Sequence, residues 1–180
     1  MNYQIIRSRR KTLSIEITPR GYILVRAPMR MSSREIHRFV EEKQDWIASH
    51  LAKLPPVDVL TEEEHQTLIR AAKEFLPHRI ALFAGQMGVS YGHITVRSQK
   101  KRWGSCTGSG NLNFNCLLML MPPEVRDYVI VHELCHRKQM NHSPLFWTEV
   151  EKILPDYRIR RQWLSDHGTA LLARLPDAQK

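Results

Sequence analysis

The chain has 180 residues, of which 42% are hydrophobic and 25% are charged, an ordinary composition for a globular protein. This length fits one domain, with room for a small N-terminal extension. No apolar run approaches the roughly 18 residues of a membrane-spanning helix, and the N-terminus lacks the apolar segment of a signal peptide. Three cysteines, an odd number, argue against a disulfide framework. We therefore expect a cytoplasmic protein without a membrane partner.

The net charge of +9 indicates the kind of partner that the surface favours. Basic residues cluster at Arg7–Lys11, Arg97–Arg102 and Arg158–Arg161. A positive surface favours anionic partners, whether nucleic acid, nucleotide or acidic peptide. Charge gives the sign of a ligand but does not identify it.

The first 56 residues predict a small antiparallel sheet followed by a helix. The helix begins after Ser32, whose spacing to Glu35 forms a capping box, and it ends before Pro55. We expect residues 1–56 to pack with a catalytic region, residues 57–180, as one compact unit. Alternating β-branched and aromatic residues predict strands over Tyr3–Ser8, Lys11–Thr18 and Tyr22–Ala27.

The next segment predicts a long helix and then three strands. The helix begins after Thr61, which forms a second capping box with Glu64, and Pro77 should kink or break it. The strands cover 93–98, 102–106 and 111–115, and the turn 107–110 joins the last two into a hairpin. Strands and helices in this order predict an α+β fold.

Three helices are predicted for the last third of the chain. They run from Pro123 to about Met140, from Pro144 to Leu154, and from Tyr157 to about Asp166. Gly168 is expected to end the last helix, and the final dozen residues to form a loosely held tail.

The first of these helices carries an H-E-x-x-H motif, His132-Glu-Leu-Cys-His136. Residues four apart lie on one helix face about one turn from each other, so both imidazoles can bind one metal ion. Glu133 lies beside them, where it can accept a proton from a metal-bound water. This pattern predicts a Zn²⁺-dependent hydrolase with Glu133 as the general base.

A catalytic zinc takes three protein ligands and keeps a fourth position open, so two histidines predict a third ligand nearby. His142 is the favoured candidate, because Pro144 prevents the helix from simply continuing and the chain can turn back over the metal. Glu149 and Glu151 on the following helix are the competing ligands. A further alternative is that His142 binds no metal and only caps the end of the helix.

Several motifs together resemble those of the YgjP-like zinc metallopeptidases, bacterial proteins similar to the SprT-like and WLM zinc-protease groups. The resemblance implies a zincin-like fold, zinc bound by His132, His136 and His142, and a catalytic Glu133. The stretches that carry it are Arg102-Trp-Gly-Ser-Cys106, His132-Glu-Leu-Cys-His136, Asn141-His-Ser143 and Phe146-Trp147.

Residues around the motif have open roles. The hairpin of residues 102–115 can align a peptide by backbone pairing or be purely structural. Trp103 is expected in the core more than in a cleft, and Cys135 is expected to pack, since it lies off the ligand face of the helix. Tyr157 can supply a hydrogen bond to the reacting group. The role of Cys106 is open.

Three functions compete. The first is a metallopeptidase, whose substrate can be a peptide or a DNA-associated protein. The second is a nucleoside triphosphate phosphohydrolase on the same metal site, which the basic residues before Trp103 favour. The third is a nucleic-acid-binding module with a structural zinc, which leaves Glu133 without a task because structural sites close all four positions.

Overall fold

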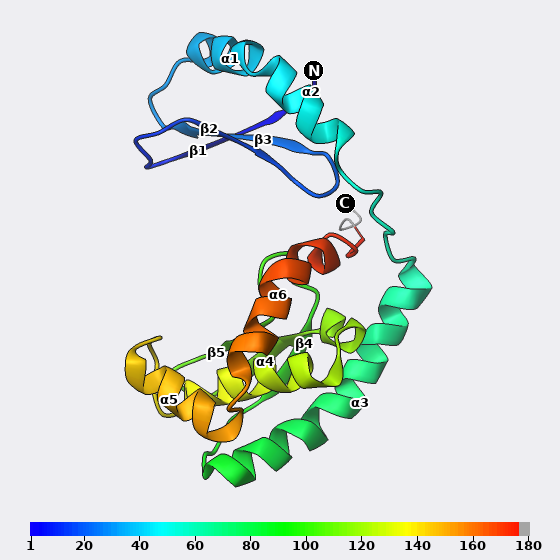
Figure 1. Ribbon diagram of the computed structural model, residues 1–180, viewed down its shortest axis with the longest axis vertical. Helices are drawn as coiled ribbons and strands as arrows, with labels where there is room; N and C mark the ends of the chain where they lie inside the picture. The colour runs from blue at the N-terminus through cyan, green and yellow to red at the C-terminus, as the bar shows by residue number, and fades with distance from the viewer. Residues whose placement is uncertain (177–180) are drawn as a thin grey trace. The chain divides into compact units, whose positions relative to one another are not determined.

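The computed structural model describes residues 1–176 (Figure 1). The chain divides into two compact units, one of Met1–Asp58 and the other beginning at Val59. None of the helices in residues 1–176 combines the length and the apolar character that crossing a membrane requires. The α+β class expected from the sequence is confirmed. In chain order the elements are β1 (Gln4–Ser8), β2 (Ser14–Ile17), β3 (Ile23–Pro28), α1 (Ser33–Glu42), α2 (Gln44–Ala52), α3 (Glu62–Met87), β4 (Ile94–Arg97), β5 (Gly104–Cys106), β6 (Leu112–Asn115), the 3₁₀ helix η1 (Cys116–Leu120), α4 (Pro123–Cys135), α5 (Pro144–Ile153) and α6 (Tyr157–Leu172).

The sheet of the first unit is mixed, so the expectation of an antiparallel sheet was wrong for one of its pairs. The strand order is β1-β3-β2, with β2 antiparallel and β1 parallel to the central strand. Ile23, Val25 and Ala27 make β3 the most apolar strand, and burying their face favours the central position. Residues 9–22 give the chain enough length to pass from β1 to a parallel β3.

Two helices cover this small sheet where the sequence predicted one. Ser32 and Glu35 form the expected capping box at the start of α1. The helix then ends at Lys43, where ψ rises to 10° and the next helix begins. Ile36 and Val40 of α1 and Ile47 of α2 share one core with β3, so the break keeps both helices against it.

The long helix α3 opens the second unit and runs through Pro77 without a break. Its expected capping box is present, with Thr61 and Glu64 bonded reciprocally. Of the kink or break predicted at Pro77, the break does not occur, because Pro77 faces solvent while its neighbours Leu76 and Ile80 are fully buried. Packing of that buried face outweighs the missing N–H of the proline.

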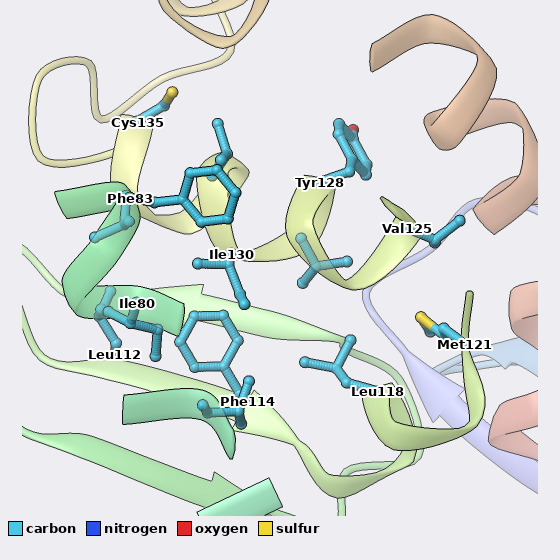
Figure 2. Packing of buried hydrophobic residues seen from close by; sticks show 14 of the residues in the cluster. Ile80, Phe83, Leu112, Phe114, Leu118, Met121, Val125, Tyr128, Ile130 and Cys135 are labelled. Carbon is cyan, nitrogen blue, oxygen red and sulfur yellow. The ribbon is translucent and has the colours of Figure 1, made fainter. Parts of the chain in front are cut away.

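The second sheet has the order β4-β6-β5, with the predicted β5–β6 hairpin and a parallel β4. Phe114 of β6 is buried against Ile80 of α3 and Ile130 of α4 in one apolar core (Figure 2). The core therefore joins α3, the sheet and α4, and α4 is also contacted by α5, α6 and β5.

The helix α4 ends five residues earlier than expected, at Cys135, with His136 as its C-cap. Arg137 explains the early end. Its guanidinium donates to the carbonyl oxygens of Ser90 at 2.9 Å and Gly108 at 3.2 Å, which fixes the chain against both the loop after α3 and the β5–β6 turn. Residues 137–143 are thereby free to reverse direction.

The helix α6 runs past Gly168, so the expectation that this glycine ends the helix was wrong. Gly168 is buried, and a Cβ there would lie 3.1 Å from Nε1 of Trp103. The glycine thus allows α6 to lie close to the Trp103 ring. The expected loose tail is also wrong over the described part: Leu175 is buried in the core, and residues 177–180 lie outside the described residues.

An ion pair links α3 to α4 beneath the core. Arg79 donates to both oxygens of Asp127, with Nε at 2.7 Å and the second nitrogen at 2.6 Å. The side chain of Asp127 is only 12% exposed, whereas that of Arg79 is 36% exposed. The bidentate geometry offsets the cost of burying the carboxylate.

Removing Arg79 should destabilise the protein, since the buried carboxylate of Asp127 then loses its partner. We expect Arg79→Ala to lower the free energy of unfolding in urea by about 2 kcal/mol, less than for a fully buried pair because Arg79 is part-exposed. Lys73→Ala removes the same charge from an exposed position of the same helix and should change stability by less than about 0.5 kcal/mol. Equal effects of the two variants would contradict this account.

Candidate metal centre

Three histidine side chains converge at the end of α4. One nitrogen from each of His132, His136 and His142 lies within 4.8 Å of the other two. Nε2 of His132 is 3.0 Å from Nε2 of His142, which the reversed loop brings back over the helix. The structure thus brings together all three histidines that the sequence singled out.

The arrangement of these nitrogens fits a metal ion. Two imidazole nitrogens 3.0 Å apart repel each other unless a proton or a cation lies between them. Burial lowers the pKa of His132 to about 3, with His136, His142 and Arg161 adding to the effect, so this ring is held in the neutral form that binds metals. Ligand nitrogens on a tetrahedral zinc are about 3.3 Å apart, close to the observed separation.

The hydrogen-bond partner of His136 leaves one of its nitrogens free for a metal. Its Nδ1 lies 3.1 Å from the carbonyl oxygen of Gln139, and a carbonyl can only accept. Nδ1 therefore carries the hydrogen, and Nε2 presents its lone pair. Burial also lowers the pKa of His136, which keeps the ring in the neutral form that binds metals.

Aromatic rings pack around the ring of His132. Its Nδ1 is buried and has no partner in the described part of the chain. Phe146 and Tyr128 contact the ring edge-on, with centroids at 4.9 Å and 5.9 Å, and the Trp147 ring lies at 5.9 Å. Packing from α4 and α5 thus orients this side chain.

The competing ligands Glu149 and Glu151 are engaged elsewhere. Glu149 accepts from Lys138 at 2.9 Å and also pairs with Lys152. Glu151 pairs with Arg158 at 2.6 Å. Neither carboxylate belongs to the histidine cluster, so the geometry favours His142 as the third ligand.

Glu133 lies beside the cluster in a buried position, 6% exposed. Burial raises the pKa of its carboxyl to about 8, while the positive charge of Arg102 acts in the opposite direction. A carboxylate with a pKa near neutrality is a suitable proton acceptor for catalysis.

Gly104 gives Glu133 the room it occupies. A Cβ at this position of β5 would lie 2.6 Å from Cγ and 2.7 Å from Oε1 of Glu133. Only glycine therefore lets the strand approach the carboxylate so closely. The sequence prediction looked for side chains that can take part in chemistry. Glycine has no such side chain, so this role of Gly104 was missed. The W-G-S-C stretch was the available signal.

The remaining residues of interest lie around the cluster. Trp103 is half-buried and packs against the core, as expected, and Cys135 is fully buried there. Tyr157 is buried and stacks on Trp147, with ring centroids 5.4 Å apart, so Trp147 lies between it and the histidines. Cys106 is half-buried, and burial raises the pKa of its thiol.

Comparison with known proteins gives the family. A model of the YgjP-like family, described as a metallopeptidase domain, matches residues 11–68 and 58–167. Two solved structures, both of metallopeptidase zymogens, are similar to about half of this chain. Abylysin of Pyrococcus abyssi is 20% identical, with a TM-score of 0.46 over 51% of this chain and 94% of that chain. Jannalysin of Methanocaldococcus jannaschii is 18% identical, with a TM-score of 0.45 over 50% and 93%.

A search of curated proteins gave no match. The family model alone covers most of the chain, and it agrees with the resemblance that the sequence motifs carry. The chain belongs to the YgjP-like metallopeptidase domain family.

Proposed function

We propose that the protein is a zinc-dependent peptidase in which His132, His136 and His142 hold the metal and Glu133 is the general base. The observation that carries the proposal is the cluster of three histidine nitrogens beside a buried carboxylate. Three protein ligands leave one coordination position open, which is typical of catalytic and not structural zinc.

The residues of the chain divide the chemical work. Zinc, when bound, polarises the substrate carbonyl and makes a water molecule more acidic. Glu133 accepts a proton from the attacking water and passes it to the nitrogen of the leaving amine. Its buried position, with Gly104 closing one side, holds the carboxylate in place for both transfers.

The strand β5 is placed to align a peptide substrate. It forms one edge of its sheet, and Gly104 within it lies against Glu133. In the described chain no other strand pairs with its outer edge. An extended peptide can therefore add to this edge by backbone hydrogen bonds, with its scissile bond carried toward the histidines.

The substrate distinguishes this proposal from its rivals. The positive charge of Arg102 acts on Glu133 and favours an anionic substrate. This observation supports the phosphohydrolase alternative. A nucleic-acid-binding module with structural zinc gives Glu133 no role. We expect a cytoplasmic enzyme that acts on peptides or on DNA-associated proteins.

Glu133→Gln should abolish peptide hydrolysis while zinc stays bound, because the amide keeps the shape of the side chain but cannot accept the proton. We expect the zinc-loaded protein to cleave casein or DNA-bound protein, and the variant to lose at least about 1,000-fold in rate. Unchanged turnover in the variant would exclude Glu133 as the base. Hydrolysis of nucleoside triphosphates without peptide cleavage would replace the peptidase by the phosphohydrolase, and salt-dependent DNA binding without any hydrolysis would favour the module.

His142→Ala should weaken zinc binding by more than about 100-fold, since a first-coordination ligand is lost. Zinc content after dialysis against a chelator of known affinity measures the change. Glu149→Gln is the matched control and should leave zinc affinity unchanged, because Glu149 pairs with Lys138 and Lys152. The reverse pattern would make Glu149 the third ligand.

Gly104→Ala should lower kcat by about 100-fold, because its methyl group displaces the carboxylate of Glu133. Zinc affinity should stay unchanged, since the histidines are not touched. Gly108→Ala in the same hairpin is the control, because a Cβ there meets nothing within 4 Å. An active Gly104→Ala enzyme would show that Glu133 tolerates displacement.

A further inference from the structure

Arg161 of α6 lies next to the metal centre without belonging to it. Its guanidinium carbon is 4.6 Å from the centre of the Trp147 ring. That ring is in turn 5.9 Å from both His132 and His142. Arg161 therefore lies one aromatic ring away from two of the proposed ligands.

The three arginines of the segment 158–161 differ in their partners. Arg158 also stacks on an aromatic ring, that of Tyr157, but it pairs with Glu151 at 2.6 Å. Arg160 pairs with Asp156 at 2.9 Å. Over residues 1–176, no carboxylate pairs with Arg161, which is exposed to solvent.

The surroundings leave this charge unneutralised. The acidic residues of α5 and of the loop before α6 are committed to other cations: Glu149 to two lysines, Glu151 and Asp156 to the other two arginines. Arg102, which is exposed and acts on Glu133, adds a second positive charge near the site. The charge of Arg161 also reaches His132.

We propose that Arg161, held against Trp147, forms an anion-binding subsite that selects substrates with a carboxylate close to the scissile bond. The contact with Trp147 restrains the guanidinium, whose planar fork of N–H groups matches the two oxygens of a carboxylate. A carboxylate can then accept two parallel hydrogen bonds, the strongest and most specific pairing that arginine makes. The subsite rests on the proposed peptidase function and gives it a substrate class, acidic polypeptides.

Two kinds of carboxylate fit this chemistry. One is the side chain of Asp or Glu next to the scissile bond, and the other is the C-terminal carboxylate of a peptide. Both present the same two oxygens to the guanidinium. Arg161 is exposed and its subsite is open to solvent, so either group can reach it.

Fluorogenic peptides that differ only by Glu or Gln at one position, scanned through three residues on each side of the scissile bond, test the subsite. Each peptide is made with a free and with an amidated C-terminus, to separate the two carboxylates. We expect the wild type to prefer one carboxylate-bearing peptide by about tenfold in kcat/KM. Arg161→Gln should abolish that preference and leave the cleavage of the neutral peptide and the zinc content unchanged.

Arg158→Gln is the matched control, because it removes a ring-stacked arginine of the same helix that already has a partner. The preference should survive in this variant. The same peptides, labelled with a fluorophore, are also bound to zinc-loaded Glu133→Gln and to its Arg161→Gln double variant, with anisotropy as the readout.

The outcomes separate the subsite from the function. Cleavage of all peptides at equal rates, or a preference that survives Arg161→Gln, overturns the subsite and leaves the peptidase intact. No cleavage, together with Arg161-dependent binding of the acidic peptide, overturns the peptidase and supports the subsite. Tripolyphosphate can be added as a competitor in the same binding assay. If it displaces the labelled peptides while no peptide is preferred over another, Arg161 binds phosphate and the carboxylate proposal is overturned.

Discussion

The close approach of two imidazole nitrogens, 3.0 Å between His132 and His142, is the constraint on which the rest of the site depends. Such a pair is unfavourable unless a cation or a proton lies between the two nitrogens. The protein must therefore supply packing that holds the rings together. It does so by ending α4 at Cys135 and anchoring Arg137 to the loop after α3 and to the β5–β6 turn, so that the loop returns His142 to the helix.

Two close approaches fix the β5–β6 hairpin and the residue before it to the helices α4 and α6. Gly104 allows β5 to lie against Glu133, and Gly168 allows α6 to lie against Trp103. Both contacts involve the W-G-S-C stretch, one through its glycine and the other through its tryptophan. This short stretch therefore links the proposed base to α6, the helix that carries Arg161.

Local signals in the sequence were sufficient for the features that depend on neighbours along the chain. Both capping boxes formed as expected, because Ser32 with Glu35 and Thr61 with Glu64 bond within one turn. The pairing of His132 with His136 followed from helical spacing in the same way. Counting zinc ligands pointed to His142, although the helix was expected to run on to Met140.

The features that the sequence missed depend on residues far apart in the chain. The parallel pairing of β1 with β3 reflects burial of the central strand, and the early end of α4 reflects the bonds that Arg137 makes to two loops. Gly168 was interpreted as a helix end because glycine commonly has that role, whereas Trp103 makes it a packing position. The sequence does not distinguish Arg161 from the other arginines of its segment. Only the fold shows that its neighbours are paired and that, over the described residues, Arg161 is not.

The buried groups of the site and the exposed arginines around it differ in their charge. Burial lowers the pKa of His132 and His136 and raises that of Glu133, which suits metal binding and proton transfer. By contrast, Arg102 and Arg161 are exposed to water, and among the described residues no carboxylate forms an ion pair with either. A cation at the histidines adds to that positive field, so the field is strongest in the metal-loaded form. An approaching carboxylate then gains from both the metal and the arginines, while a cationic segment is repelled by both. The positive charge of the whole chain is thus also present around the proposed metal site. Under this proposal, selectivity for acidic substrates follows from the same packing that brings the metal ligands together.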